Sequence, residues 1–165
     1  MKTAKTKIIE NNILIPFQAE QLREGKEVLF TPIGVSMRPF IEGGKDVVVL
    51  RKLPELKIGD IVLAAIQPPT SGSGAVQQPT AQCSNVRYVL HRIIAIDGAQ
   101  VTLIGDGNIG ITERCTKTDV LGTVIRIENA RGRRKLLTKG RLWYHLRGQR
   151  RILLKIYRHL PWLTT

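Results

Sequence analysis

The amino-acid sequence predicts a mostly β fold, in which short strands and hairpins form one compact domain. Short runs rich in β-branched residues recur between residues 28 and 128, and such runs favour strands over helices. Glycines and prolines separate the runs at spacings typical of hairpins. The 165 residues, 42% hydrophobic and 24% charged, are enough for one folded domain with an appendage.

The N-terminal region, residues 1–26, is interpreted as an arm followed by a short helix. Residues 1–16 form the expected arm, and residues 17–25 form the expected helix, which Gly25 would end. Residues 27–128 form the expected β domain. Its predicted strands are residues 28–31, 47–52, 61–66, 86–96, 101–104 and 120–128.

One interval inside the β domain has a different composition. Residues 67–84 are polar and rich in proline, glycine and serine, which predicts a mobile loop between two strands. We favour a tolerated surface insertion over a loop that gates access for a substrate.

The positive charge is concentrated at the C-terminal end of the chain. The formal net charge is +13, and residues 129–165 contain 11 of the 26 Lys and Arg residues but no Asp or Glu. Such a tail indicates an anionic partner, which is a membrane surface, a nucleic acid or an acidic protein. A tail that only adds solubility is the alternative.

Within this tail, residues 139–160 show the periodicity of an amphipathic helix. One interpretation places its apolar face at a membrane and its basic residues at anionic headgroups. The other packs the apolar face on the β domain as a capping helix. The residues expected to contact a membrane or another anionic partner are Arg141, Trp143, Arg147, Arg150, Arg151, Lys155 and Arg158.

The sequence indicates a protein without a membrane-spanning helix or cleaved signal peptide. No apolar run reaches the roughly 18 residues that a spanning helix needs, and Glu10 interrupts the apolar run after Ile9. We therefore expect the protein in the cytoplasm or peripherally on a membrane.

Cys83 and Cys115 form neither a disulfide framework nor a CxxC pair. No metal or other cofactor is expected.

A serine in a constrained turn is the first candidate for chemistry. Ser36 stands in the sequence Gly-Val-Ser-Met-Arg-Pro, residues 34–39, which directly follows a predicted strand. A turn of this kind can expose the Oγ atom and leave backbone N–H groups free beside it. A nucleophilic serine needs that access, and it needs donors for the developing oxyanion.

Two further motifs carry a histidine and a carboxylate. His91 lies within the β-type run 88–94, where a partly buried neutral imidazole can act as a general base. Asp106 lies in the turn Gly-Asp-Gly-Asn, residues 105–108, where it can orient an imidazole. Taken singly, each has an ordinary explanation, namely a structural histidine and a plain turn.

In this order, the motifs resemble the superfamily of type I signal peptidases and LexA-type self-cleaving repressors. Residues 34–39 are similar to its nucleophile segment Gly-x-Ser-Met-x-Pro. Residues 57–62 are similar to the Gly-Asp-Ile-Val strand entry, residues 88–98 to the general-base segment, and residues 105–108 to the Gly-Asp-Asn segment. The resemblance extends from about residue 27 to residue 128 and implies a signal-peptidase/LexA-like β domain.

The resemblance also implies roles for individual residues. His91 stands where bacterial signal peptidases have a lysine, which is similar to the branch with a Ser/His site. Ser36 would be the nucleophile, His91 the general base, and Asp106 the carboxylate that orients it, with Asp119 as a second candidate carboxylate. Residues expected around the substrate and oxyanion are Gly34, Val35 and Met37. Because position 34 is glycine, the hydroxyl donor of some relatives is absent and the second oxyanion donor is unassigned.

The expected function is that of a serine endopeptidase of the signal-peptidase type. It would cleave an extended leader peptide, bound by strand addition, through Ser/His acyl transfer. Three alternatives stay open: a self-cleaving repressor-like peptidase, a catalytically silent peptide-binding module on the same fold, and nucleic-acid binding through the basic residues 131–135. Nucleic acid is the less favoured partner because residues 1–26 contain no helix-turn-helix motif.

Overall fold

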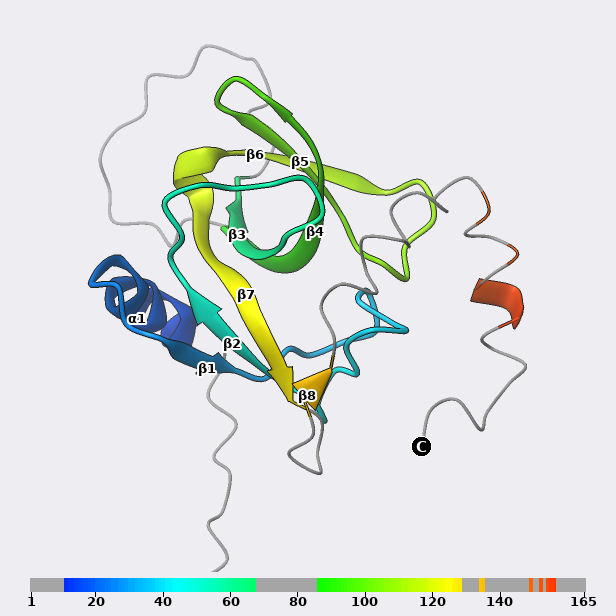
Figure 1. The fold of residues 1–165 in the computed structure, drawn as a ribbon, viewed down its shortest axis with the longest axis horizontal. Helices are drawn as coiled ribbons and strands as arrows, with labels where there is room; N and C mark the ends of the chain where they lie inside the picture. The colour runs from blue at the N-terminus through cyan, green and yellow to red at the C-terminus, as the bar shows by residue number, and fades with distance from the viewer. Residues whose placement is uncertain are drawn as a thin grey trace, which may run out of the picture.

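The computed structural model describes residues 11–67 and 86–128, together with positions 134, 135, 149, 152 and 154–156. This part of the chain has a mostly β fold with one helix before the first strand (Figure 1). The predicted fold class and N-terminal helix are thereby confirmed. The predicted loop 67–84, except Gln67, lies outside the described residues, as does most of the predicted basic helix.

The elements agree with the sequence ranges to different degrees. β3 and β7 have the predicted bounds, β6 was not predicted, and the helix begins at Asn11 rather than at residue 17. The elements are α1 Asn11–Arg23, β1 Val28–Phe30, β2 Val47–Arg51, β3 Ile61–Ile66, β4 Arg87–Asp97, β5 Gln100–Ile104, β6 Thr112–Thr116, the 3-10 turn η1 Lys117–Asp119, β7 Val120–Glu128 and β8 Arg134–Lys135.

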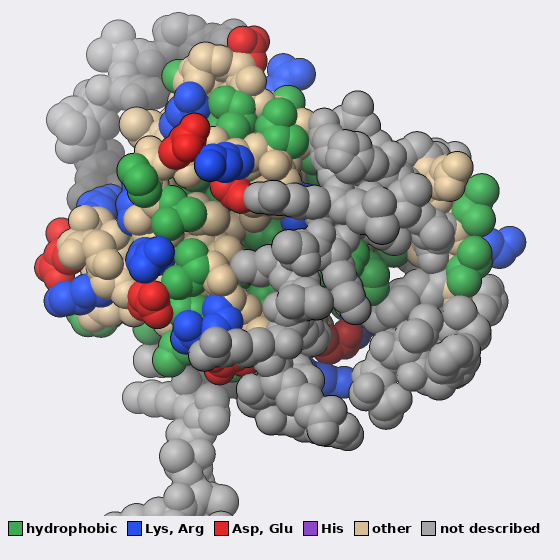
Figure 2. Space-filling view, in the orientation of Figure 1, with side chains coloured by type: hydrophobic (Ala, Val, Ile, Leu, Met, Phe, Trp, Pro, Cys, Tyr) green, Lys and Arg blue, Asp and Glu red, His purple; other side chains and the backbone are tan. Residues whose placement is uncertain are grey.

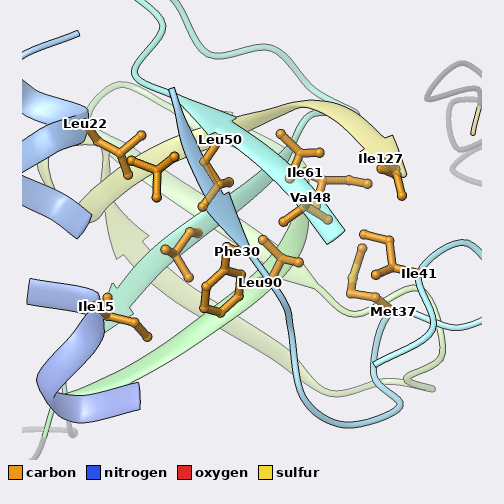
Figure 3. Packing of buried hydrophobic residues seen from close by; sticks show 13 residues of the cluster. Ile15, Leu22, Phe30, Met37, Ile41, Val48, Leu50, Ile61, Leu90 and Ile127 are labelled. Atoms are coloured by element: carbon orange, nitrogen blue, oxygen red, sulfur yellow. The ribbon is translucent and has the colours of Figure 1, made fainter. Parts of the chain in front are cut away.

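The longer helix follows from how α1 packs on the sheet. Ile15 and Leu22 are both fully buried and are seven residues apart, a spacing that puts them on one helical face. Figure 3 shows both side chains directed toward the strands, near Phe30 and Leu50. Pro16 lies inside the helix but is exposed. The expectation of an arm up to residue 16 is therefore wrong for residues 11–16.

The described strands form one antiparallel sheet in the order β1-β2-β7-β3-β4-β5-β6, with β8 added to β7. The sheet curls on itself (Figure 1). The register shifts where β7 pairs with β2 and with β3, and where β4 pairs with β5, and such shifts mark places where a strand can bend. One core cluster packs between α1 and the sheet, and another packs among β3, β4, β5, β6 and the start of β7.

The surface of the β domain contrasts with the charge of the tail. On the face shown in Figure 2, acidic and basic side chains are interspersed among apolar ones over the described residues. Within the described part of the chain, no helix is long and apolar enough to cross a membrane.

The thiol of Cys115 on β6 is buried, and we expect it to resist alkylation in the folded protein. Burial, with a smaller effect of the Asp119 carboxylate, raises the pKa of this thiol from 9.0 to about 11. The folded state therefore favours the protonated thiol over the thiolate. The contribution of this preference to the free energy of unfolding is present below pH 9.0 and is lost as the pH rises toward about 11.

The measurement is peptide mass spectrometry after iodoacetamide treatment at about pH 8, in native buffer and in urea. Cys115 should be labelled slowly in buffer and rapidly in urea. Equal labelling rates in the two solutions would contradict a buried, protonated thiol.

Candidate active site

Ser36 is held in a tight turn within the loop between β1 and β2. Gly34 has a φ of +99°, a backbone angle that residues other than glycine rarely adopt. The Arg38 N–H donates to the Val35 carbonyl at 3.1 Å, which closes the turn. Met37 is buried in the core cluster beneath the turn, beside Ile41 (Figure 3). The turn is therefore anchored on both sides of Ser36, whose own side chain is half-buried.

The His91 side chain lies beside Ser36. His91 is on β4, opposite Val62 of β3, and its side chain is 6% exposed. The Nε2 atom is 3.1 Å from Ser36 Oγ, which is within reach for proton transfer. The two residues are 55 positions apart in the sequence, and the fold brings them together as the motifs indicated.

The opposite ring nitrogen of His91 contacts a carboxylate that the sequence analysis missed. Glu113 on β6 places Oε2 at 2.8 Å from His91 Nδ1, and the Glu113 side chain is buried. Its other oxygen is 3.4 Å from the Arg87 guanidinium. A carboxylate at Nδ1 favours the tautomer with the proton on that nitrogen, so Nε2 can accept the Ser36 proton.

The expectation that Asp106 orients His91 is corrected by this geometry. The Asp106 carboxylate accepts two hydrogen bonds from Arg92, from Nε at 2.8 Å and from Nη2 at 2.6 Å. Arg92 also donates to the Gly59 carbonyl at 2.7 Å and lies over the Phe40 ring. The Arg92 and Asp106 side chains are both almost completely buried.

Strand geometry explains why the two carboxylates have these partners. Neighbouring residues on a strand point to opposite faces of the sheet, so His91 and Arg92 face opposite ways. Arg92 is paired with Ile104 across β4 and β5, and Asp106 follows two residues after Ile104. Asp119, the second candidate, accepts hydrogen bonds from the Thr116 N–H and hydroxyl at the start of η1.

The Gly-Asp-Gly-Asn turn supports the backbone of the nucleophile. The Gly107 N–H donates to the Ser36 carbonyl at 2.7 Å. A Cβ atom at Gly105 would lie 2.6 Å from that same carbonyl oxygen, and one at Gly107 would lie 2.9 Å from the Val35 oxygen. Both positions need glycine because the backbone of the turn around Ser36 packs directly against them.

A cleft of about 330 Å³ opens in front of Ser36. Gly34 and Met37 line it, as expected, whereas Val35 is exposed and lies outside its lining. The polar residues in its lining are Ser36, Arg87, His91, Asn108 and Glu113. The larger apolar ones are Ile15, Phe30, Ile33, Met37, Ile41, Leu63, Val89, Leu90 and Ile111, together with Tyr88.

The turn around Ser36 contains backbone N–H groups without an acceptor among the described residues. Among the residues that the structure describes, the backbone N–H groups of Ser36 and Met37 donate to no other residue.

Lys52 lies away from Ser36 and lines a separate cavity. Burial and the nearby Arg23 lower the pKa of Lys52, and its ammonium donates to the Val120 carbonyl. A Ser/Lys arrangement around Ser36 therefore has no support from Lys52.

Two other sequence expectations concern metals and the basic tail. Within the ranges 11–67 and 86–128, no cluster of three or more His, Cys, Asp or Glu residues could hold a metal ion. Of the seven residues expected to contact an anionic partner, Lys155 is described and is exposed. The other six, Arg141, Trp143, Arg147, Arg150, Arg151 and Arg158, lie outside the described residues.

We expect Arg92→Met to destabilise the fold, because it removes the guanidinium that donates two hydrogen bonds to the buried Asp106 carboxylate. Breaking a buried pair in this way lowers the free energy of unfolding by about 3–5 kcal/mol. The matched control is Arg126→Met, which removes a part-exposed pair with Glu128 and should cost about 1 kcal/mol or less. Urea unfolding measures both, and an equal effect of the two substitutions would contradict the assigned role of Arg92.

Comparisons of the chain with protein-family models, with curated proteins and with solved structures found no match.

Proposed function

We propose that this protein is a serine endopeptidase of the signal-peptidase type, with a Ser36–His91–Glu113 site. The observation that carries the proposal is the continuous chain of contacts from Ser36 Oγ through the His91 ring to Glu113. These three side chains line one cleft. Ser36 comes from the loop between β1 and β2, His91 from β4 and Glu113 from β6. The resemblance of residues 27–128 to the signal-peptidase superfamily supports the same chemistry.

The proposed reaction is acyl transfer to Ser36. Oγ attacks the carbonyl carbon of the scissile peptide bond while His91 Nε2 takes the Oγ proton. The tetrahedral intermediate collapses as the carbon–nitrogen bond breaks, and Nε2 gives the proton to the leaving amine. Water then attacks the acyl-enzyme, again with His91 as base, and releases the carboxylic acid and free Ser36.

Glu113 acts through His91 rather than on the substrate. Its carboxylate holds Nδ1–H and stabilises the imidazolium that forms when Nε2 takes the proton. The side chains of His91 and Glu113 are each only 6% exposed, so little water screens their interaction. Arg87 contacts the outer oxygen of Glu113 and is itself exposed.

The proposed substrate is an extended peptide, such as a leader peptide, with apolar side chains near the cleaved bond. The floor of the cleft is formed by core residues such as Phe30, Leu63 and Leu90. Ile33 and Ile111 line it as well and are 70% and 63% exposed. An apolar cleft of this size suits a few side chains of a bound peptide.

The test is mass spectrometry of a pool of synthetic peptides that includes leader peptides of exported proteins. Each sample is incubated with wild type or with Ser36→Ala, with and without anionic lipid vesicles. Cleavage that requires Ser36 supports the proposal, and stimulation by vesicles would point to a membrane role for residues 129–165. No cleavage in any sample would contradict it and would favour a silent peptide-binding module, or nucleic-acid binding through the basic tail.

We expect Glu113→Gln to lower kcat by a factor on the order of 10²–10⁴, because the amide no longer holds the required tautomer or stabilises the imidazolium. His91→Ala should lower kcat at least as much, and the double variant should lose little more, because the residues act as a unit. The measurement is steady-state kinetics on the best-cleaved peptide.

Glu128→Gln is the matched control, since its carboxylate lies in a part-exposed pair with Arg126. It should keep the wild-type kcat. A Glu113→Gln variant that also keeps the wild-type kcat would remove Glu113 from the site.

A further inference from the structure

We propose that the side-chain amide of Asn108 donates a hydrogen bond to the oxyanion that forms during peptide cleavage. This inference rests on the proposed peptidase function and adds a residue to its site. Asn108 lines the cleft that Ser36 and His91 also line, and its side chain is half-buried. It occupies the last position of the Gly-Asp-Gly-Asn turn.

The turn fixes Asn108 relative to the nucleophile. The Asn108 N–H donates to the Gly105 carbonyl at 3.0 Å, which closes the turn. The Gly107 N–H donates to the Ser36 carbonyl at 2.7 Å, which joins the turn to the nucleophile. Between them, Asp106 is held by the buried Arg92. The backbone on which the amide stands is therefore attached directly to the backbone of Ser36.

The amide nitrogen itself lies close to the nucleophile turn. The point where a Gly105 Cβ atom would stand is 2.8 Å from Asn108 Nδ2 and 2.6 Å from the Ser36 carbonyl oxygen. Gly105 thus leaves room beside its α-carbon for both the Asn108 amide and the Ser36 carbonyl. Among the described residues, the Asn108 side chain has no hydrogen-bond partner. Because Asn108 also lines the cleft, its amide can donate to a ligand bound there.

The nucleophile turn leaves room for such a donor. The Ser36 N–H can supply one hydrogen bond, but Gly34 has no side chain to contribute another, and the space beside its α-carbon is open. A tetrahedral oxyanion is stabilised by fixed donors, and an asparagine amide is a donor used for this purpose in other acyl-transfer enzymes. The amide is uncharged, so its partial desolvation in the cleft costs far less than that of a lysine or arginine.

The experiment compares wild type, Asn108→Ala and Asn108→Asp on the best-cleaved peptide. Asn108→Asp keeps the shape of the side chain but replaces the N–H donor with a negatively charged oxygen. Both variants should lower kcat by a factor on the order of 10²–10³ while KM changes little, because the oxyanion exists only beyond the ground state. Ile109→Ala, an exposed neighbour outside the cleft lining, is the control and should keep the wild-type kcat.

A second readout separates a donor from a merely structural residue. A peptide aldehyde forms a tetrahedral adduct with Ser36, so its affinity for the variants should fall in parallel with kcat/KM. The affinity of the product peptide should stay unchanged, as should the thermal unfolding midpoint. Loss of product binding together with aldehyde binding would show a structural role and overturn the proposal.

The outcomes for Asn108 and for the peptidase function are distinguishable. If wild type cleaves peptides through Ser36 but both Asn108 variants keep their kcat within about threefold, only the assignment of Asn108 fails, since a lost oxyanion donor costs far more than this. If wild type shows no cleavage that requires Ser36, the peptidase function fails, and the oxyanion role of Asn108 fails with it.

Discussion

The buried ion pair between Arg92 and Asp106 is the interaction on which the candidate site depends. Arg92 fixes the Asp106 carboxylate with two hydrogen bonds, and Asp106 belongs to the turn whose Gly107 N–H holds the Ser36 carbonyl. Burying two charges is costly and often contributes little net stability. We infer that this pair mainly fixes the position of the nucleophile, because through the turn at residues 105–108 it connects the central strand β4 to the loop that carries Ser36.

The same strand serves the chemistry on its other face. His91 precedes Arg92, so its imidazole faces the cleft while the guanidinium faces Asp106. The curl of the sheet then brings Glu113 of β6 to the imidazole, although β5 lies between β4 and β6 in the sheet order. Two neighbouring residues thus use two different carboxylates, one to fix the scaffold and one to orient the proposed base.

Local patterns predicted much of the fold, and their failures have physical explanations. β3 and β7 matched their predicted ranges because both are rich in apolar, β-branched residues, and buried positions lie on both faces of each strand. β6 was missed because its sequence, Thr-Glu-Arg-Cys-Thr, has a charged residue on its buried face. The start of α1 was misplaced because packing of Ile15 on the sheet extends the helix beyond residue 17, through Pro16 to Asn11.

The sequence by itself determined the fold class. It also predicted Ser36 and His91 as partners, because the motifs that contain them are short and occur in a characteristic order along the chain. Only the tertiary structure decided which carboxylate meets which cation. Asp106 lies in the more conspicuous motif, yet strand register directs it to Arg92. Glu113 lies in an inconspicuous strand, yet the curl of the sheet directs it to His91. Side-chain facing and sheet curvature are properties of the assembled strands, so no single segment of the sequence contains them.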